Sequence, residues 1–446
     1  MTDQIDRPSE SLPPPVVDDA RTSRSDRLKS ELVAGGSVTE LSDDELAGGW
    51  RGALSLTAIA ALFVFLAFVN MWWFMFVVGV VVSIFLHELG HFATARWTGM
   101  KVTQFFLFFG PRLWSFRRGE TEYGVRAIPL GAFVRIVGMH RVDEVDPADE
   151  GRTYRQATFP RRLLVISGGS IMHMLIAITL LFTVYLGQGE RTDEALPEVY
   201  IGEAVEGLPA AEQGLQADDQ ILSIGGVDVT SSTELGAAVR SFDPAQTVDV
   251  EIVRDGVEMT LPVALGTRVD VPEDNELFGT AYLGVSSYSP PVYEQHSVGA
   301  AAVNSVTDIF PAAWESTKGV VKVLNPVNVL THLNGTNEDL SSRPTTLVQV
   351  TAISDDIGDS EGIWGVLWLL AVLNVFVGVF NMFPLLPLDG GHAAIAVYER
   401  IREKMRGGTQ RYFADVERLM PLAMGVMALL LSLMVAGLYL DITDPL

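Results

Sequence analysis

Three residues at the end of an apolar stretch have the types and the spacing of a metal site. His87, Glu88 and His91 form the pattern H-E-x-x-H. Residues four apart lie on one face of an α-helix, so both imidazoles can reach the same zinc ion. Glu88 stands beside that position and can take a proton from a water molecule there. The pattern therefore indicates metal-dependent hydrolysis.

A catalytic zinc ion usually has three protein ligands and one open position. Asp389 follows the apolar run 375–388, and a carboxylate at such a place is costly unless it has a partner or a function. His392 is the competing ligand, and Asp389 is preferred because it lies closer to the apolar run. We therefore expect one zinc ion per chain, held by His87, His91 and Asp389.

The composition of the chain limits the classes of protein to consider. Its 446 residues are 48% hydrophobic, with a mean hydropathy of +0.27, yet the formal net charge is -24. Together these values suggest apolar membrane spans joined to acidic soluble parts. The acidic balance argues against a nucleic-acid partner, which needs clustered Lys and Arg. The chain has no cysteine, which excludes disulfides and thiolate zinc sites.

Long apolar segments must position these residues. The run 53–93 is about twice the length of a bilayer core. We predict two spans, at 53–69 and 72–95, that reverse near Asn70; one helix preceded by a buried amphipathic arm is the alternative. The remaining predicted spans are 163–186, 363–388 and 419–440.

Charge predicts the orientation of these spans. Basic residues concentrate in 96–162 and 400–418, whereas 187–362 is acidic and has few of them. By the positive-inside rule, the two basic segments lie in the cytoplasm and the acidic segment lies outside. We therefore expect a multi-pass membrane protein, and the family resemblance described below implies the bacterial cytoplasmic membrane. Residues 1–50, rich in Ser, Pro and acidic residues, are expected to form a disordered cytoplasmic tail.

The outer segment contains a small β-rich domain. Apolar strands such as Val199–Ile201 and Val248–Val253 alternate with turn residues such as Gly225-Gly226 and Asp255-Gly256. Residues 298–323 have apolar side chains at helical spacing, which suits a helix on the outer membrane surface or packing against the β-rich domain. The predicted division is a tail (1–50), a transmembrane half (51–186), the β-rich domain (197–268), an outer segment (269–362) and a second transmembrane half (363–446).

Two motifs in this order resemble the site-2 proteases, a family of intramembrane zinc metalloproteases. They are H87-E-L-G-H91 and N381-M-F-P384-L-L-P387-L-D389-G-G, with a PDZ-like insert between them. The chain is most similar to the actinobacterial branch that cleaves membrane-bound anti-sigma factors. The resemblance implies a polytopic α-helical membrane protein of four to five transmembrane helices. It also implies His87, His91 and Asp389 as zinc ligands and Glu88 as general base.

The resemblance extends to other segments. Phe108–Arg112 followed by Gly119–Gly138 looks like the membrane-associated β-hairpin of the family, with a bend at Gly131, and 208–224 resembles a PDZ signature. The third span departs from the family, which has Gly-Pro and then Asn where this chain has Gly168-Gly169 and then His173. His173 is expected either to approach the metal or to bond to a neighbour.

The resemblance implies cleavage of a single-span membrane protein, such as an anti-sigma factor or a remnant signal peptide, within the lipid bilayer. The predicted substrate-binding residues are Asn381, Asn374, Pro384 and Gly131. The PDZ-like domain is expected to exclude substrates with bulky outer domains; capture of a carboxyl terminus is the alternative, disfavoured by nearby Asp218 and Asp219. A metal-binding membrane scaffold and a zinc or proton transporter are the competing functions.

Overall fold

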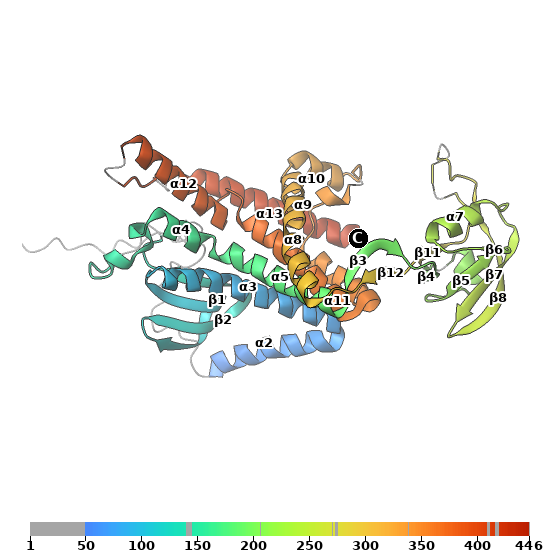
Figure 1. The fold of residues 1–446 in the computed structure, drawn as a ribbon, viewed down its shortest axis with the longest axis horizontal. Coiled ribbons are helices and arrows are strands. Elements are labelled where there is room, and N and C mark those ends of the chain that lie inside the picture. Colours follow the sequence, from blue (N-terminus) through green and yellow to red (C-terminus); the bar gives the residue numbers. More distant parts are fainter. Residues whose placement is uncertain are drawn as a thin grey trace, which may run out of the picture. The chain divides into compact units, whose positions relative to one another are not determined.

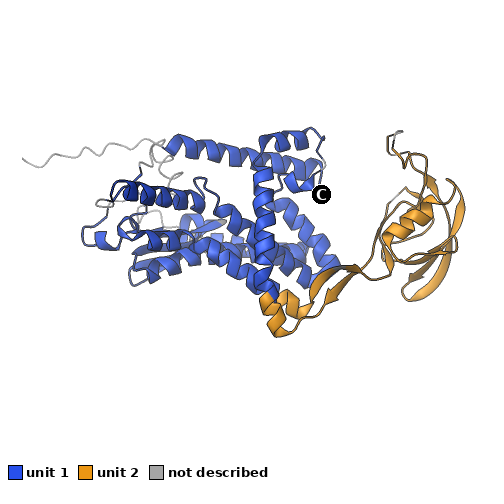
Figure 2. Ribbon diagram, turned by 45° about the horizontal axis from the view of Figure 1, so that its top comes forward, with its two compact units in different colours: residues 1–182, 304–446 blue, residues 183–303 orange. Residues whose placement is uncertain are grey.

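The computed structural model describes residues 50–139, 145–205, 207–269, 271–272, 275–337, 339–407, 411–414 and 419–445. The tail expected over residues 1–50 lies, apart from Trp50, outside them. The chain forms two compact units (Figures 1 and 2). Unit 1 combines the residues up to Phe182 with Asn304–Leu446, and unit 2 is Thr183–Val303.

The first apolar run forms two helices that break near Asn70, where the sequence predicts the reversal between two spans. Helix α2 (Trp50–Val69) ends just before Asn70, and α3 (Met71–Trp97) begins just after it and packs beside α2 (Figure 1). The Asn70 side chain caps α3 by accepting a hydrogen bond from the Trp73 amide at 3.0 Å. Side chains of α2 such as Phe68 are exposed, so α2 is not the buried amphipathic arm of the alternative.

A β-hairpin follows α3 and packs against it. Strand β1 (Val102–Arg118) and strand β2 (Thr121–Ile136) are antiparallel on either side of the turn. Arg118 lies opposite Thr121 next to the turn, and the pairing continues to Arg112 opposite Arg126. Beyond the turn the strands bend, and β1 residues near Leu107 pair with both Val125 and Ala132. Gly131 has a φ of 84°, a conformation that favours glycine. The sequence therefore placed this bend correctly.

The predicted third span is broken in two. Helix α4 (Phe159–Ile166) and helix α5 (Gly168–Gly187) meet at Ser167. Buried apolar side chains join the end of α3 and the start of β1 to α4 and α12 (Asp389–Met405). This cluster, which fixes the base of the site, consists of Ala95, Met100, Val102, Ile136, Tyr154, Val165, Ile166, Ala393 and Ala396.

The second half of unit 1 is helical. Helix α11 (Leu347–Asn381) starts well before residue 363, where we expected it, and has non-helical geometry at Gly362 (φ 65°). Helix α13 (Met420–Thr443) is tied to the start of α11 because the Thr346 hydroxyl donates to Asp441 at 2.6 Å. The predicted amphipathic segment forms two helices, α8 (Val298–Thr307) and α9 (Ile309–Val323), and α9 packs on α11. The smaller helices of this region are α10 (Pro326–Leu333) and the 3-10 turn η4 (Leu340–Ser342).

Within the described residues, four helices are long and apolar enough to cross a membrane: α3, α5, α11 and α13. The apolar part of α2, Leu54–Val69, is shorter.

Unit 2 is a β domain with its own core. Its sheet has the order β11-β4-β5-β7-β8, with β6 paired to β5, and α7 (Ser232–Arg240) packs against β5. The sheet includes a strand beyond the range 197–268 expected for this domain: β11 pairs with β4. A separate pair, β3 and β12, brings Ala195 opposite Pro291. The strands are β3 (Glu190–Ala195), β4 (Val199–Ala204), β5 (Gln220–Ile224), β6 (Val227–Asp228), β7 (Thr247–Arg254), β8 (Val257–Ala264), β9 (Gly266–Thr267), β10 (Ala281–Tyr282), β11 (Val285–Tyr288) and β12 (Pro291–Glu294), and α6 (Pro209–Glu212) is a single turn.

Candidate metal centre

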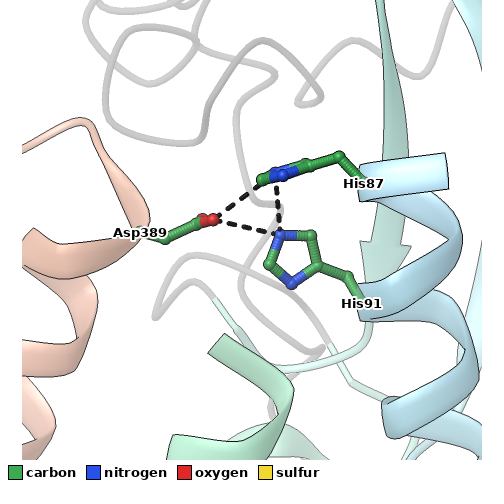
Figure 3. A group of neighbouring side chains, drawn as sticks. All are labelled: His87, His91 and Asp389. Atoms are coloured by element: carbon green, nitrogen blue, oxygen red, sulfur yellow. Dashed lines mark hydrogen bonds and ion pairs between the residues drawn. The ribbon is translucent and has the colours of Figure 1, made fainter. Parts of the chain in front are cut away.

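His87, His91 and Asp389 meet at one point in unit 1 (Figure 3). The histidines project from neighbouring turns of α3, and Asp389 is the first residue of α12. The Nε2 atoms of the two imidazoles are 3.2 Å apart. Asp389 Oδ2 lies 3.4 Å from Nε2 of His87 and 3.2 Å from Nε2 of His91. The three side chains predicted from the sequence as ligands are therefore brought together.

These atoms fit a zinc ion. Ligand atoms at about 2.0–2.1 Å from a tetrahedral zinc ion lie roughly 3.3 Å from one another. The three separations, from 3.2 to 3.4 Å, match that spacing. Asp389 Oδ2 is also buried without a hydrogen-bond partner, as expected for an oxygen that faces a cation.

The backbone of α4 fixes the orientation of His91. Its Nδ1 lies 2.7 Å from the carbonyl oxygen of Val165. A carbonyl can only accept, so Nδ1 carries the proton and Nε2 presents its lone pair to the metal position. Hydrogen bonds of this kind commonly orient histidine ligands. Val165 gives no signal in the sequence, because a backbone carbonyl acts here.

A chain of buried polar side chains leads to His87. His173 on α5 has its ring centroid 4.9 Å from that of His87. The Asn374 amide nitrogen donates to Ser83 Oγ and to the Leu370 carbonyl, so its Oδ1 accepts from His173 Nδ1 at 2.8 Å. His173 thus has both features that the sequence left open: it is bonded to a neighbour, and it lies beside a candidate ligand.

Gly169 explains why the third span has two successive glycines. A Cβ atom at Gly169 would lie 2.3 to 2.6 Å from ring atoms of His87. One at Gly168 would lie 2.8 Å from the carbonyl oxygen of Gly90. Only glycine lets α5 approach α3 this closely without moving the imidazole.

The loop before Asp389 explains the sequence Asp-Gly-Gly. Helix α11 ends at Asn381, and the chain turns through Pro384 and Pro387 before α12 begins. A Cβ atom at Gly390 would lie 2.2 Å from the carbonyl oxygens of Met382 and Phe383. Glycine therefore allows α12 to pack on this loop, which places the Asp389 carboxylate opposite α3.

The predicted substrate residues lie in different surroundings. Asn381 has no side-chain hydrogen bond to any described residue, and Pro384 lines a cavity of about 550 Å³ between α5, α9 and α11. Gly131 lies at the bend of β2. Asn374, in contrast, is buried, and both ends of its amide are bonded within the bundle. Its geometry suits the support of His173 rather than contact with a substrate.

Comparison with known proteins agrees with this geometry. Residues 75–424 match the model of peptidase family M50. The chain is 33% identical over 403 residues to the zinc metalloprotease Rip1 of Mycobacterium tuberculosis, covering 83% of this chain and 97% of the relative. It is 28% identical over 372 residues to the chloroplastic membrane metalloprotease ARASP of Arabidopsis thaliana, covering 81% and 76%.

Among solved structures, part of the chain is similar to the PDZ domain of the SdrC-like protein of Listeria monocytogenes. That match has 22% identity and a TM-score of 0.18, and it covers 22% of this chain and 93% of the other. The family match takes in both halves of the candidate centre, since its limits enclose His87, His91 and Asp389. This chain is a membrane protein that belongs to peptidase family M50, the intramembrane zinc metalloproteases.

Proposed function

We propose that His87, His91 and Asp389 bind the catalytic zinc ion and that Glu88 is the general base for cleavage of a peptide bond. The observation that carries this proposal is the convergence of three ligand atoms within 4.8 Å, from helices that begin in separate halves of the sequence. Two imidazoles and a carboxylate this close are costly in apolar surroundings unless a cation stabilises them.

The residues have distinct tasks in this reaction. His87, His91 and Asp389 would hold the zinc ion, which would supply a Lewis acid for the carbonyl group of the scissile bond. Glu88, next to His87 on α3, takes a proton from the attacking water molecule and passes it to the departing amide nitrogen. A scaffold or transporter needs no such carboxylate beside the ligands, so Glu88 distinguishes the protease from both alternatives.

The test is to separate zinc binding from cleavage in the full-length protein. Glu88→Gln should retain zinc and lose cleavage of a membrane-embedded reporter by about a hundredfold or more, because an amide cannot accept the proton. His87→Ala and Asp389→Ala should lose both zinc and cleavage, whereas His392→Ala should keep zinc. Glu315→Gln on the exposed face of α9 is the control. Near-normal cleavage by Glu88→Gln would favour the scaffold or the transporter instead.

We propose that the substrates are single-span membrane proteins, such as an anti-sigma factor or a remnant signal peptide. The protein would act in a bacterial cytoplasmic membrane, with the basic segments 96–162 and 400–418 inside and unit 2 outside. A transmembrane helix must unwind before cleavage, because its carbonyl groups are hydrogen-bonded. An unpaired edge of the β1–β2 hairpin, bent at Gly131, would take the unwound segment as an added strand. Asn381 and Pro384 would contact that segment next to Asp389.

We propose that unit 2 selects substrates by excluding those with bulky outer domains. Capture of a carboxyl terminus is a second candidate, and one observation now favours it. Asp219 does not face the domain groove: it is buried and accepts two hydrogen bonds from Arg254, both 2.7 Å long. The groove, of about 370 Å³ between α7 and β11, has Arg240 and Arg268 in its lining and no acidic residue among the described ones.

A deletion variant can distinguish these two modes. Leu196 and Pro290 are joined by a backbone hydrogen bond of 2.8 Å at the end of the β3–β12 pair. Replacing residues 197–289 by a short Gly-Ser linker would therefore remove the sheet at a closed stem. The filter predicts that this variant cleaves a substrate with its outer domain intact as well as a trimmed one. Loss of cleavage of the trimmed substrate would overturn the filter and support capture.

A further inference from the structure

A cleft lies between the end of α3 and the turn of the β1–β2 hairpin, within unit 1. Its volume is about 750 Å³. None of its residues belongs to the candidate metal centre. The lining consists of Phe92, Arg96, Phe116, Arg118, Gly119, Glu120 and Tyr123.

One wall of this cleft is aromatic. Phe116 stacks on Tyr123 with ring centroids 5.4 Å apart and an interplanar angle of 19°. Tyr123 in turn meets the edge of Phe92 at 5.8 Å. Arg96 lies over the Phe92 ring, 5.8 Å from its centroid. The rings thus form a continuous apolar surface that ends at a guanidinium group.

The cleft carries unbalanced positive charge. Among the described residues, no carboxylate forms an ion pair with Arg96 or Arg118. The acidic residue of the lining, Glu120, is already bound by both terminal nitrogens of Arg152, at 2.6 and 2.8 Å. This hydrogen bonding lowers the pKa of Glu120, so it stays ionised and neutralised by Arg152. Two guanidinium groups therefore remain available for an anion.

The position of the cleft matches the boundary of a bilayer. Arg96 lies in the last turn of α3, which is long and apolar enough to cross a membrane. The next residue, Trp97, is 81% exposed, and Phe116 is 45% exposed. Exposed aromatic and basic side chains at the end of a span sit at the level of lipid headgroups.

We propose that this cleft binds one anionic phospholipid, with its phosphodiester on Arg96 and Arg118 and its glycerol and upper acyl chain on the aromatic wall. Arginine suits this role because its planar donors match the oxygens of a phosphate. A free phosphate ion would use the guanidinium groups but leave the aromatic wall uncovered. The assignment requires α3 to cross the bilayer, but it does not depend on the metal centre or on proteolysis.

The test places the full-length protein in nanodiscs of phosphatidylcholine with a minor fraction of phosphatidylglycerol. The protein is then released from the nanodiscs, and native mass spectrometry measures the lipid that stays bound to it. The wild-type protein should retain one phosphatidylglycerol molecule. The Arg96→Gln/Arg118→Gln variant should bind it about thirtyfold more weakly, from the usual effect of two basic residues near an anionic surface. The matched control is Arg117→Gln/Arg161→Gln: it removes the same charge, and Arg117 is adjacent to Arg118 in β1 but points to the opposite face.

The outcomes distinguish the lipid from other anions. Two results together support the proposal. Of the two double variants, only Arg96→Gln/Arg118→Gln should retain less lipid than the wild-type protein. Millimolar inorganic phosphate should leave the retention of lipid by the wild-type protein unchanged. An equal loss of lipid retention in both double variants would show non-specific charge attraction and would overturn the proposal. Displacement of the lipid by phosphate alone would also overturn it, because the aromatic wall would then contribute nothing. Zinc content and thermal unfolding should match between the two variants, which excludes misfolding as the cause.

Discussion

At the scale of single residues, the two histidines of the centre are held by different means. A carbonyl group of α4 holds His91 through its Nδ1 atom. The ring of His87 is instead confined between Gly169 and the ring of His173. Nδ1 of His87 is buried and has no hydrogen-bond partner among the described residues. The position of His87 therefore depends on the shape of its surroundings, and it should be the more sensitive of the two proposed ligands to changes in packing.

A methyl group at Gly169 tests this dependence. In Gly169→Ala the added Cβ would lie as little as 2.3 Å from the His87 ring, so the imidazole must move. We expect zinc content and cleavage to fall together, while the protein still inserts and folds. The control is Gly425→Ala on α13, where nothing lies within 4 Å of the added carbon. Elemental analysis of the purified variants measures the zinc content per protein molecule. A wild-type zinc content in Gly169→Ala would contradict the dependence of His87 on packing.

His173 gives a second prediction at this scale. His173→Ala removes the ring beside His87 and leaves Asn374 Oδ1 without its partner. Partners that orient metal ligands typically contribute about 10- to 100-fold in metal affinity, so zinc should bind at least tenfold more weakly. His173→Asn, which restores a donor, should recover part of the loss. A competition titration with a chelator measures this. An unchanged zinc affinity in His173→Ala would leave the residue a purely structural role.

Side-chain chemistry at this scale could be predicted only in part. The H-E-x-x-H spacing and the unexplained charge of Asp389 pointed to the three ligands, because both signals are local. The bond from His91 to Val165 involves a backbone group, and the chain from Ser83 through Asn374 joins residues distant in sequence. Asn374 was predicted to bind substrate, but its amide is bonded within the bundle to His173 and Ser83, contacts that the sequence does not show.

At the scale of elements, one ion pair joins the helix that carries Asp389 to the helix that supports His91. Arg162 on α4 and Glu399 on α12 are 2.6 Å apart, with side chains 12% and 6% exposed. Glu399 also accepts a hydrogen bond from the Ala414 amide at 2.8 Å. The Arg162 guanidinium lies over the Tyr154 ring at 4.9 Å. The pair thus links α4, α12 and the segment after α12.

Removing one partner should loosen α12 as a whole. Glu399→Gln leaves the Arg162 charge buried without its counterion, which typically costs about 3–5 kcal/mol. We expect a lower free energy of unfolding, measured by denaturation in detergent micelles, and weaker zinc binding because Asp389 moves with α12. Glu315→Gln, which breaks an exposed pair with Lys318, should change stability by less than about 1 kcal/mol. Similar losses in both variants would contradict a special role for the buried pair.

The elements were predicted best where hydropathy is uniform. The break at Asn70 follows from a polar residue between two apolar runs. Helix α11 begins well before residue 363, where the predicted span starts, and Asp355, Asp356 and Asp359 lie on the additional part of the helix. The Asn70 amide donates to Asp355 at 2.6 Å, and the Trp72 indole donates to Asp359 at 2.8 Å. Tertiary hydrogen bonds therefore stabilise a helical turn that hydropathy alone excludes.

At the scale of the whole molecule, unit 2 has the properties of an independent domain. The buried residues of its core lie between Val199 and Leu283, and Val285 of β11 packs against them. The residues of this core come from the strands of the sheet, from α6 and α7, and from the loops that connect them, including the segment that leads to β11. Every described residue of this core belongs to unit 2.

A fragment of residues 197–290 should therefore fold by itself in water. We expect one cooperative thermal transition by circular dichroism and dispersed amide resonances. A fragment ending at residue 268 should be markedly less stable, because β4 then loses its partner β11 and the core loses Leu283. If the fragment 197–290 showed no cooperative thermal transition, unit 2 would require the membrane part of the chain in order to fold. Equal stability of the two fragments would mean that β11 is dispensable.

The division of the proposed metal ligands between α3 and α12 has a consequence for how the protein is made. A ribosome delivers His87 and His91 to the membrane early, but Asp389 follows only after unit 2 and most of the helical bundle. Until then the nascent chain has two imidazoles and no carboxylate ligand. With the proposed ligand set, a chain that ends before Asp389 lacks a complete zinc site, so it should not cleave neighbouring proteins in the membrane. Separately expressed halves should regain zinc only when both are present in the same bilayer.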